Sequence, residues 1–155
     1  MDSPQNYIWG PHLWLILHSS AEWIGSKQLQ KLPQEESRIW INILSSLRFS
    51  LPCPLCKKHY TAYFSSHPIT SVSREFIRNW LFNLHNQINT QNSKQNNITL
   101  ESIPEIYGKP FHFSSKVSVV SEQMTKGLRI GISSHNDIQK TLRAFQELKR
   151  FYDFF

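Results

Sequence analysis

The sequence predicts an all-α protein, in which a compact helical bundle over residues 8–108 precedes a C-terminal extension over residues 109–155. Two observations support this class. Apolar residues recur at intervals of three and four in several long segments, and no strand-like runs alternate with them, so a parallel sheet is not expected. The 155 residues are enough to bury a core without metals or structural disulfides.

Four segments of the bundle combine helical periodicity with boundary residues: about 10–25, 33–52, 54–64 and 73–89. Pro11 and Pro54 suit the first position of a helix, and the second helix opens near Pro33. Ser73 is a good N-cap for the fourth helix. The polar, Asn-rich residues 90–97 predict a loop after it.

The C-terminal part is less regular. A short helical turn is expected within residues 99–107, residues 111–121 are ambiguous, and an amphipathic helix is expected over about 136–152 after a capping Asn136. We favour packing of the apolar stripe of this last helix on the bundle or on a second subunit. The alternative is that its phenylalanines form a docking surface for substrate proteins or membranes.

Charge and composition exclude several classes of protein. The net charge is +6, but Lys and Arg are scattered, so we expect no nucleic-acid-binding patch. The N-terminus lacks the basic and apolar segments of a secretory signal, and the longest apolar run, residues 13–17, is too short to span a membrane. We therefore expect a soluble intracellular protein.

The two cysteines, Cys53 and Cys56, are the first candidates for chemistry. With Pro54 at the first helical position, both sulfurs lie near free N–H groups and the positive end of the helix dipole, which favours the reactive thiolate. Lys57 and Lys58 are expected to add positive charge. Redox chemistry is the favoured interpretation. A zinc site completed by two of three histidines and a pair of idle buried thiols remain alternatives. Those histidines are His59, His67 and His85.

Polar residues also interrupt two apolar helix faces. Trp14 and His18 are four residues apart on the first helix, and His85 and Asn89 are four apart on the fourth, with Asn86 beside them. Buried polar groups need partners, so these residues either bond to one another between helices or bind a polar ligand.

Three segments, in this order, resemble the Erv/ALR family of FAD-linked sulfhydryl oxidases. Residues 9–18, WGPHLWLILH, resemble its W-x-x-x-H signature. Residues 53–60, CPLCKKHY, resemble its C-x-x-C-x-x-H-aromatic motif. Residues 80–89, WLFNLHNQIN, resemble its W-x-x-x-x-H-N-x-V-N motif, and Lys94 falls where the family places a lysine near the cofactor.

The resemblance implies a four-helix bundle with a short fifth helix, a homodimer, and FAD held against the C-x-x-C. By position, Cys56 is the flavin-proximal sulfur and Cys53 exchanges with thiol-containing substrate proteins. Electrons would pass through the Cys53–Cys56 disulfide to FAD and then to O2, giving H2O2. The residues that would line the cofactor are Gly10, Trp14, His18, Tyr60, His85, Asn86, Asn89 and Lys94, with Tyr107 as a candidate late aromatic.

The chain departs from the larger family members, because it has no second, shuttle cysteine pair. In this it resembles the compact enzymes of large cytoplasmic DNA viruses. The expected location is therefore the cytoplasm, with the virion as a second location if the protein is viral. Residues 110–155 match no motif of the family.

Overall fold

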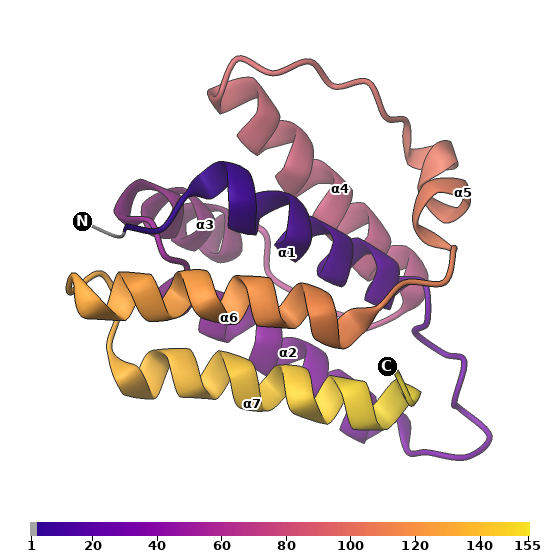
Figure 1. The fold of residues 1–155 in the computed structure, drawn as a ribbon. Helices are drawn as coiled ribbons and strands as arrows, with labels where there is room; N and C mark the ends of the chain where they lie inside the picture. The colour runs from indigo at the N-terminus through magenta and orange to yellow at the C-terminus, as the bar shows by residue number, and fades with distance from the viewer. Residues whose placement is uncertain (1–2) are drawn as a thin grey trace.

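The computed structural model describes residues 3–155, and within them it contains helices and no strand, which confirms the all-α class (Figure 1). A 3-10 turn, Leu100–Ser102, precedes the shortest helix. The helices are α1 (Asn6–Ala21), α2 (Pro33–Ser50), α3 (Pro54–Ser66), α4 (Arg74–Gln91), α5 (Ile103–Tyr107), α6 (Phe113–Arg129) and α7 (His135–Tyr152).

The expected start of the first helix at Gly10-Pro11 is wrong, because α1 begins at Asn6 and Pro11 lies inside it. The amides of Ile8 and Trp9 both bond to the carbonyl of Gln5, which closes an additional turn. The Trp9 ring is buried in the core, so packing holds this turn although Pro11 lacks an N–H group. The helix also ends at Ala21, before the expected stop at Gly25.

The third and fourth helices begin where the sequence predicts. Pro54 is the first residue of α3, and Ser73 caps α4 by accepting a hydrogen bond from the amide of Phe76. The N-cap of α7 is Ser134, which accepts from the amide of Asp137, and the expected cap Asn136 lies inside that helix. The expectation for Asn136 was wrong because Ser134 lies one residue before the first helical turn and offers its hydroxyl there.

The ambiguous segment 111–121 belongs to α6, whose seventeen residues run on to Arg129. Helix α6 packs along α1, and α7 packs along α2, as Figure 1 shows for the two C-terminal helices beside the bundle. Residues Phe113, Phe145 and Leu148 are almost fully buried in the same core as α1 and α2. The stripe of α7 therefore packs on the bundle, which confirms the favoured interpretation.

Buried polar groups also join α7 to α2. The hydroxyl of Tyr152 donates to a carboxylate oxygen of Glu36 at 2.5 Å and accepts from Nε1 of Trp40 at 3.0 Å. The hydroxyl of Thr141 bonds to those of Ser46 and Ser50 at 2.7 and 2.6 Å. These contacts satisfy side chains that would otherwise be unpaired in the core.

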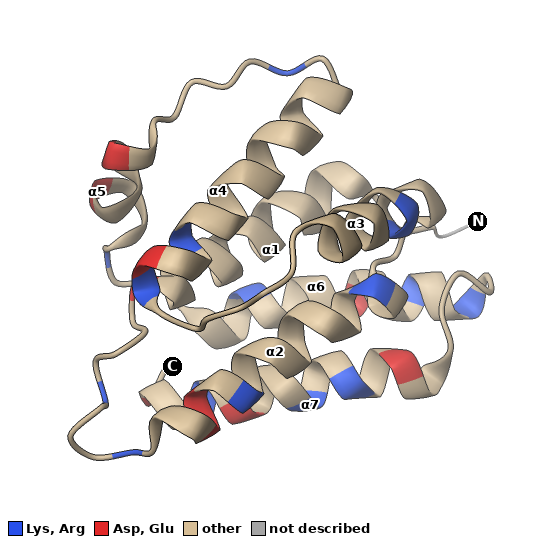
Figure 2. Cartoon of the chain, turned by 180° about the vertical axis from the view of Figure 1, so that it is seen from behind, with Lys and Arg blue, Asp and Glu red and all other residues tan. Residues whose placement is uncertain are grey.

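Charged residues are distributed over several helices. In the view of Figure 2, Lys and Arg lie on α2, α3, α4, α6 and α7, and acidic residues lie on α2, α4 and α7. Within residues 3–155, no helix has the length and the apolar character needed to cross a membrane.

Candidate functional site

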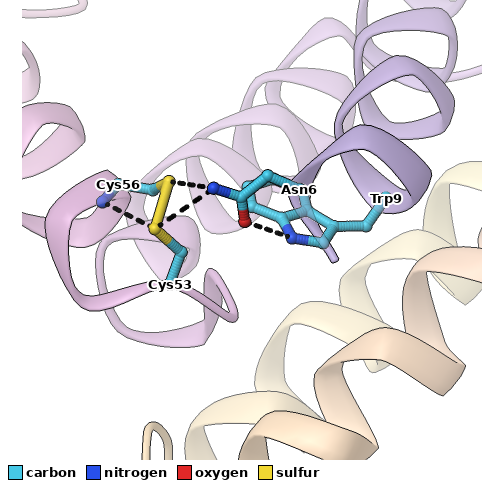
Figure 3. The surroundings of a disulfide bond; sticks show 4 residues. All are labelled: Asn6, Trp9, Cys53 and Cys56. Atoms are coloured by element: carbon cyan, nitrogen blue, oxygen red, sulfur yellow. Dashed lines mark hydrogen bonds between the residues drawn. A yellow bond between two sulfur atoms is a disulfide. The ribbon is translucent and has the colours of Figure 1, made fainter. Parts of the chain in front are cut away.

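The centre of the site is a disulfide between Cys53 and Cys56 at the N-terminus of α3 (Figure 3). Helix α2 ends at Ser50, and Pro54 starts α3 three residues after Leu51, so the two cysteines lie in the first turn of a new helix. Cys53 is extended and caps α3, and its sulfur accepts a hydrogen bond from the amide of Cys56 at 3.2 Å. Both cysteines are half-buried, so the disulfide is accessible from solvent.

Asn6 lies against this disulfide from the first turn of α1. Its amide nitrogen Nδ2 is 3.6 Å from Sγ of Cys53 and 3.7 Å from Sγ of Cys56, and its oxygen Oδ1 accepts from Nε1 of Trp9 at 3.0 Å (Figure 3). Asn6 is not among the residues predicted from the sequence, because the expected first helix starts after it, at Gly10-Pro11. The signal that was available is the pair Asn6 and Trp9, which are three apart and share a face once the helix starts earlier.

The lysines that follow the cysteines differ in their surroundings. The ammonium group of Lys57 donates to the carbonyl of Ile132 in the α6–α7 connection. Burial lowers the pKa of Lys57, and the nearby Asp137 carboxylate opposes that shift. Lys58 is exposed. The connection between α6 and α7 thus holds the ammonium group of Lys57 against a backbone carbonyl.

Four aromatic rings from three helices form a stack, which we call the aromatic cluster: Trp14 and His18 of α1, His85 of α4 and Tyr107 of α5. The rings of Trp14 and His85 lie 3.9 Å apart and are nearly parallel, at 5°. The rings of His18 and Tyr107 lie 4.5 Å apart at 19°. Nε2 of His18 and Nδ1 of His85 are 3.0 Å apart, so one imidazole donates to the other. The two polar helix faces therefore meet.

Both imidazoles of the aromatic cluster are held neutral near pH 7. Burial, together with a smaller contribution from the nearby His85, lowers the pKa of His18 to about 3. Burial also lowers the pKa of His85 to about 4, with a second contribution from the ammonium group of Lys94. Nδ1 of His18 is buried and has no hydrogen-bond partner within residues 3–155. An unpaired buried nitrogen is costly, which is typical of a site that serves a bound group.

The remaining candidate residues divide between this site and the core. Asn86 and Asn89 are half-buried on α4, and the amide of Lys94 bonds to the carbonyl of Asn89 at 2.7 Å, which folds the loop back onto the end of α4. At Gly10 an added Cβ would meet no atom of the protein within 4 Å. This half-buried face of α1 can therefore receive a flat ligand closely.

Tyr60 lies in a different environment. Its side chain is buried, its hydroxyl donates to the carbonyl of Leu44, and its ring packs near Phe64 and Trp80. Burial raises the pKa of its hydroxyl well above the usual value, so this group is a neutral donor. The structure does not join Tyr60 to the aromatic cluster, and a contact between Tyr60 and a cofactor stays a prediction.

The geometry does not favour the zinc alternative. Within residues 3–155, no group of three or more His, Cys, Asp or Glu side chains is placed to hold a metal ion. The two cysteines are bonded to each other, and His85 is paired with His18. An oxidised cysteine pair supplies no thiolate ligand to zinc.

A disulfide in the first turn of a helix, on an all-α scaffold with a neutral aromatic cluster, defines a dithiol–disulfide class of site. The model of the Erv1 / Alr family matches residues 11–107, more than half of the chain, so this protein belongs to the Erv1 / Alr family. That match covers α2 to α5 and most of α1.

Two curated viral proteins are similar to this chain. One is "Probable FAD-linked sulfhydryl oxidase R368" of Acanthamoeba polyphaga mimivirus, 28% identical over 91 residues, which cover 56% of this chain and 60% of that protein. Another is "Putative FAD-linked sulfhydryl oxidase 088R" of Frog virus 3 (isolate Goorha), 26% identical over 102 residues, which cover 64% and 65%. The chain thus spans under two thirds of either relative. No solved structure matches it.

Proposed function

We propose that this protein is a FAD-dependent sulfhydryl oxidase, which forms disulfide bonds in substrate proteins and delivers the electrons to dioxygen. The observation that carries the proposal is the half-buried Cys53–Cys56 disulfide at the start of α3. Helix α1 connects it to the aromatic cluster, because Asn6 touches the sulfurs while Trp14 and His18 follow about two and three turns later. Membership of the Erv1 / Alr family and the names of the viral relatives support the same activity.

The residues around the aromatic cluster fit FAD. Trp14 is half-buried and can offer a flat face to a ring system, the neutral imidazoles stacked beside it add no charge, and Gly10 leaves space one turn earlier on α1. The side chains of Asn86 and Asn89 can donate to and accept from the ring edge, and Lys94 can pair with a phosphate. The unpaired Nδ1 of His18 is consistent with a site that is completed by a ligand.

The chain's own residues account for the exchange of thiols with the disulfide. A substrate thiolate attacks Sγ of Cys53, which forms a mixed disulfide, breaks the Cys53–Cys56 bond and leaves the electron pair on Sγ of Cys56. A second substrate thiolate then attacks the substrate sulfur of the mixed disulfide, and Cys53 leaves as a thiolate. The N-terminus of α3 stabilises both thiolates through its free N–H groups and its dipole.

Bound FAD supplies the two-electron oxidation that restores the disulfide, with dioxygen as the final acceptor and hydrogen peroxide as the product. The 155 residues contain two cysteines, so no second cysteine pair within them can relay electrons from a substrate. Substrate thiols must then reach Cys53 directly. The exposure of Pro54 and Leu55 between the two cysteines supports this direct access.

The test combines a spectrum with an activity measurement. Purified protein should show a flavin absorption spectrum, release FAD on denaturation, and consume dioxygen when a dithiol is added. The Cys56→Ser variant should keep FAD and lose thiol oxidation, while Asn42→Asp, an exposed change on α2, should keep both. A colourless folded protein, or persistent thiol oxidation by Cys56→Ser, would overturn the proposal.

Two further parts of the proposal concern assembly and place. The family resemblance supports a homodimer. The proposed location is the cytoplasm, with the virion as a second location if the protein, like its relatives, is viral. Light scattering after gel filtration tests the first, with a mass of 18.3 kDa expected for one chain. Immunodetection in infected cells and in purified particles tests the second.

A further inference from the structure

We propose that Asn6 is a catalytic residue of thiol–disulfide exchange, whose amide N–H stabilises the thiolate released when the Cys53–Cys56 bond opens. The inference rests on the proposed function, because it assigns a role within that exchange. None of the three motifs that resemble the family includes Asn6, which lies before the first of them, residues 9–18. Its position on α1 places a side-chain donor against a disulfide that belongs to α3 (Figure 3).

The orientation of the Asn6 amide follows from its other neighbour. Nε1 of Trp9 can only donate, so the atom of Asn6 that faces it at 3.0 Å must be the carbonyl oxygen. The NH2 group then necessarily points to the two sulfurs. Trp9 is buried, with 6% of its surface exposed, so it provides a rigid anchor for this orientation.

The donors are shared unequally between the two sulfurs. Sγ of Cys53 receives the amide N–H of Cys56 as well as the Asn6 N–H, whereas Sγ of Cys56 receives the Asn6 N–H without that backbone donor. When a substrate thiolate bonds to Cys53, the charge develops on Cys56. Asn6 is therefore a side-chain donor placed to stabilise that leaving thiolate in addition to the N-terminus of α3, and a better-stabilised thiolate leaves faster. When Cys53 leaves in turn, the backbone N–H of Cys56 and Asn6 both face it.

A change of Asn6 to Asp separates this role from a structural one. Asp has the same shape and still accepts from Trp9, but it replaces the N–H that faces the sulfurs with a carboxylate oxygen. Asn6 is the first residue of α1, and the first turn of α1 holds no acidic residue. A carboxylate at a helix N-terminus interacts favourably with the dipole, so Asn6→Asp should fold as well as the parent.

The experiment uses the full chain and two readouts. The first is the pKa of the Cys56 thiol, measured from thiolate absorbance in a Cys53→Ser background. The second is the rate at which dithiothreitol reduces the disulfide of the chain with both cysteines. Asn6→Asp and Asn6→Leu are each compared with the parent and with Asn42→Asp, which makes the same chemical change at an exposed position of α2.

Asn6→Asp should raise the pKa of the Cys56 thiol by about one unit and slow reduction of the disulfide about tenfold. These effects correspond to the lower end of the range for a hydrogen bond to a charged group, because Asn6 is exposed. Asn6→Leu, which lacks the added charge, should slow reduction by a smaller factor. Asn42→Asp should match the parent in both. If the Asn6 variants and the parent unfold at the same urea concentration, the changes in thiol pKa and reduction rate do not come from unfolding.

The outcome that overturns the inference is an Asn6→Asp protein whose thiol pKa and reduction rate equal those of Asn42→Asp. Neither readout requires FAD or dioxygen, so the test of Asn6 can be scored separately from the test of the proposed oxidase activity. If the parent fails to oxidise thiols while Asn6→Asp still shifts the pKa, the proposed function fails and the role of Asn6 in exchange holds. If the parent turns over and Asn6→Asp reacts equally fast, only the role of Asn6 fails.

Discussion

Acidification from pH 7 to pH 5 should destabilise the protein through the two histidines of the aromatic cluster. Burial holds the pKa of His18 at about 3 and that of His85 at about 4, against an ordinary value of 6.5. At a pH between the pKa of a histidine in the folded chain and its pKa in the unfolded chain, the unfolded chain binds a proton that the folded chain does not. The free energy of unfolding therefore has its full value above pH 6.5 and falls as the pH drops towards 4 and 3.

The magnitude follows from the size of this window. One proton difference changes the free energy of unfolding by about 1.4 kcal/mol per pH unit, so His18 should account for a loss of about 2 kcal/mol between pH 6.5 and pH 5. His85 is partly exposed and should contribute less. For a chain of this size, such a loss is a substantial share of the total stability.

Urea denaturation at pH 7, 6 and 5, at constant flavin content, measures this loss. The variant His18→Gln keeps a hydrogen-bonding group but does not titrate, so its free energy of unfolding should fall by about 2 kcal/mol less than that of the parent over the same range. His135→Gln removes an exposed imidazole at the start of α7 and should keep the parent's pH dependence. Equal pH slopes for His18→Gln and the parent would refute the reasoning, whatever the absolute stabilities.

Three other substitutions have expected outcomes. Tyr152→Phe leaves Nε1 of Trp40 unpaired and removes a donor from the Glu36 carboxylate, so it should cost about 3 kcal/mol in urea denaturation; a loss under about 1 kcal/mol would contradict this. Gly10→Ala meets no atom of the protein, so it should stabilise flavin-free α1 by about 0.5 to 1 kcal/mol and weaken FAD binding in a fluorescence titration. An unchanged FAD affinity of Gly10→Ala would show that Gly10 does not contact the cofactor. Lys94→Ala should weaken FAD binding about tenfold and leave the rate of disulfide reduction unchanged, and equal affinity would exclude a phosphate contact.

Local features of the sequence were sufficient to predict the redox element. Pro54 starts α3 and Cys53 caps it, because proline and the cap residue act within a single turn of backbone. The same holds for Ser73 and α4, and a spacing of four residues is enough to place His85 and Asn89 on one face. The helical class follows for the same reason, since apolar periodicity is a property of each segment by itself.

Other boundaries depended on contacts with distant residues. The additional turn of α1 exists because the Trp9 ring is buried in the core, and no local signal outweighed the proline at position 11. Asn6 was missed for this reason, since its contact with Cys53 and Cys56 bridges 47 and 50 residues of sequence.

The sequence by itself thus determined the helical class, the cysteine pair at a helix start and the polar residues on two helix faces. Only the tertiary structure decided which faces meet: it stacked Tyr107 on His18, kept Tyr60 in the core and packed α6 and α7 on α1 and α2. The physical reason is range. Caps and periodicity act over three or four residues, whereas burial and ring stacking join side chains that are far apart in the chain.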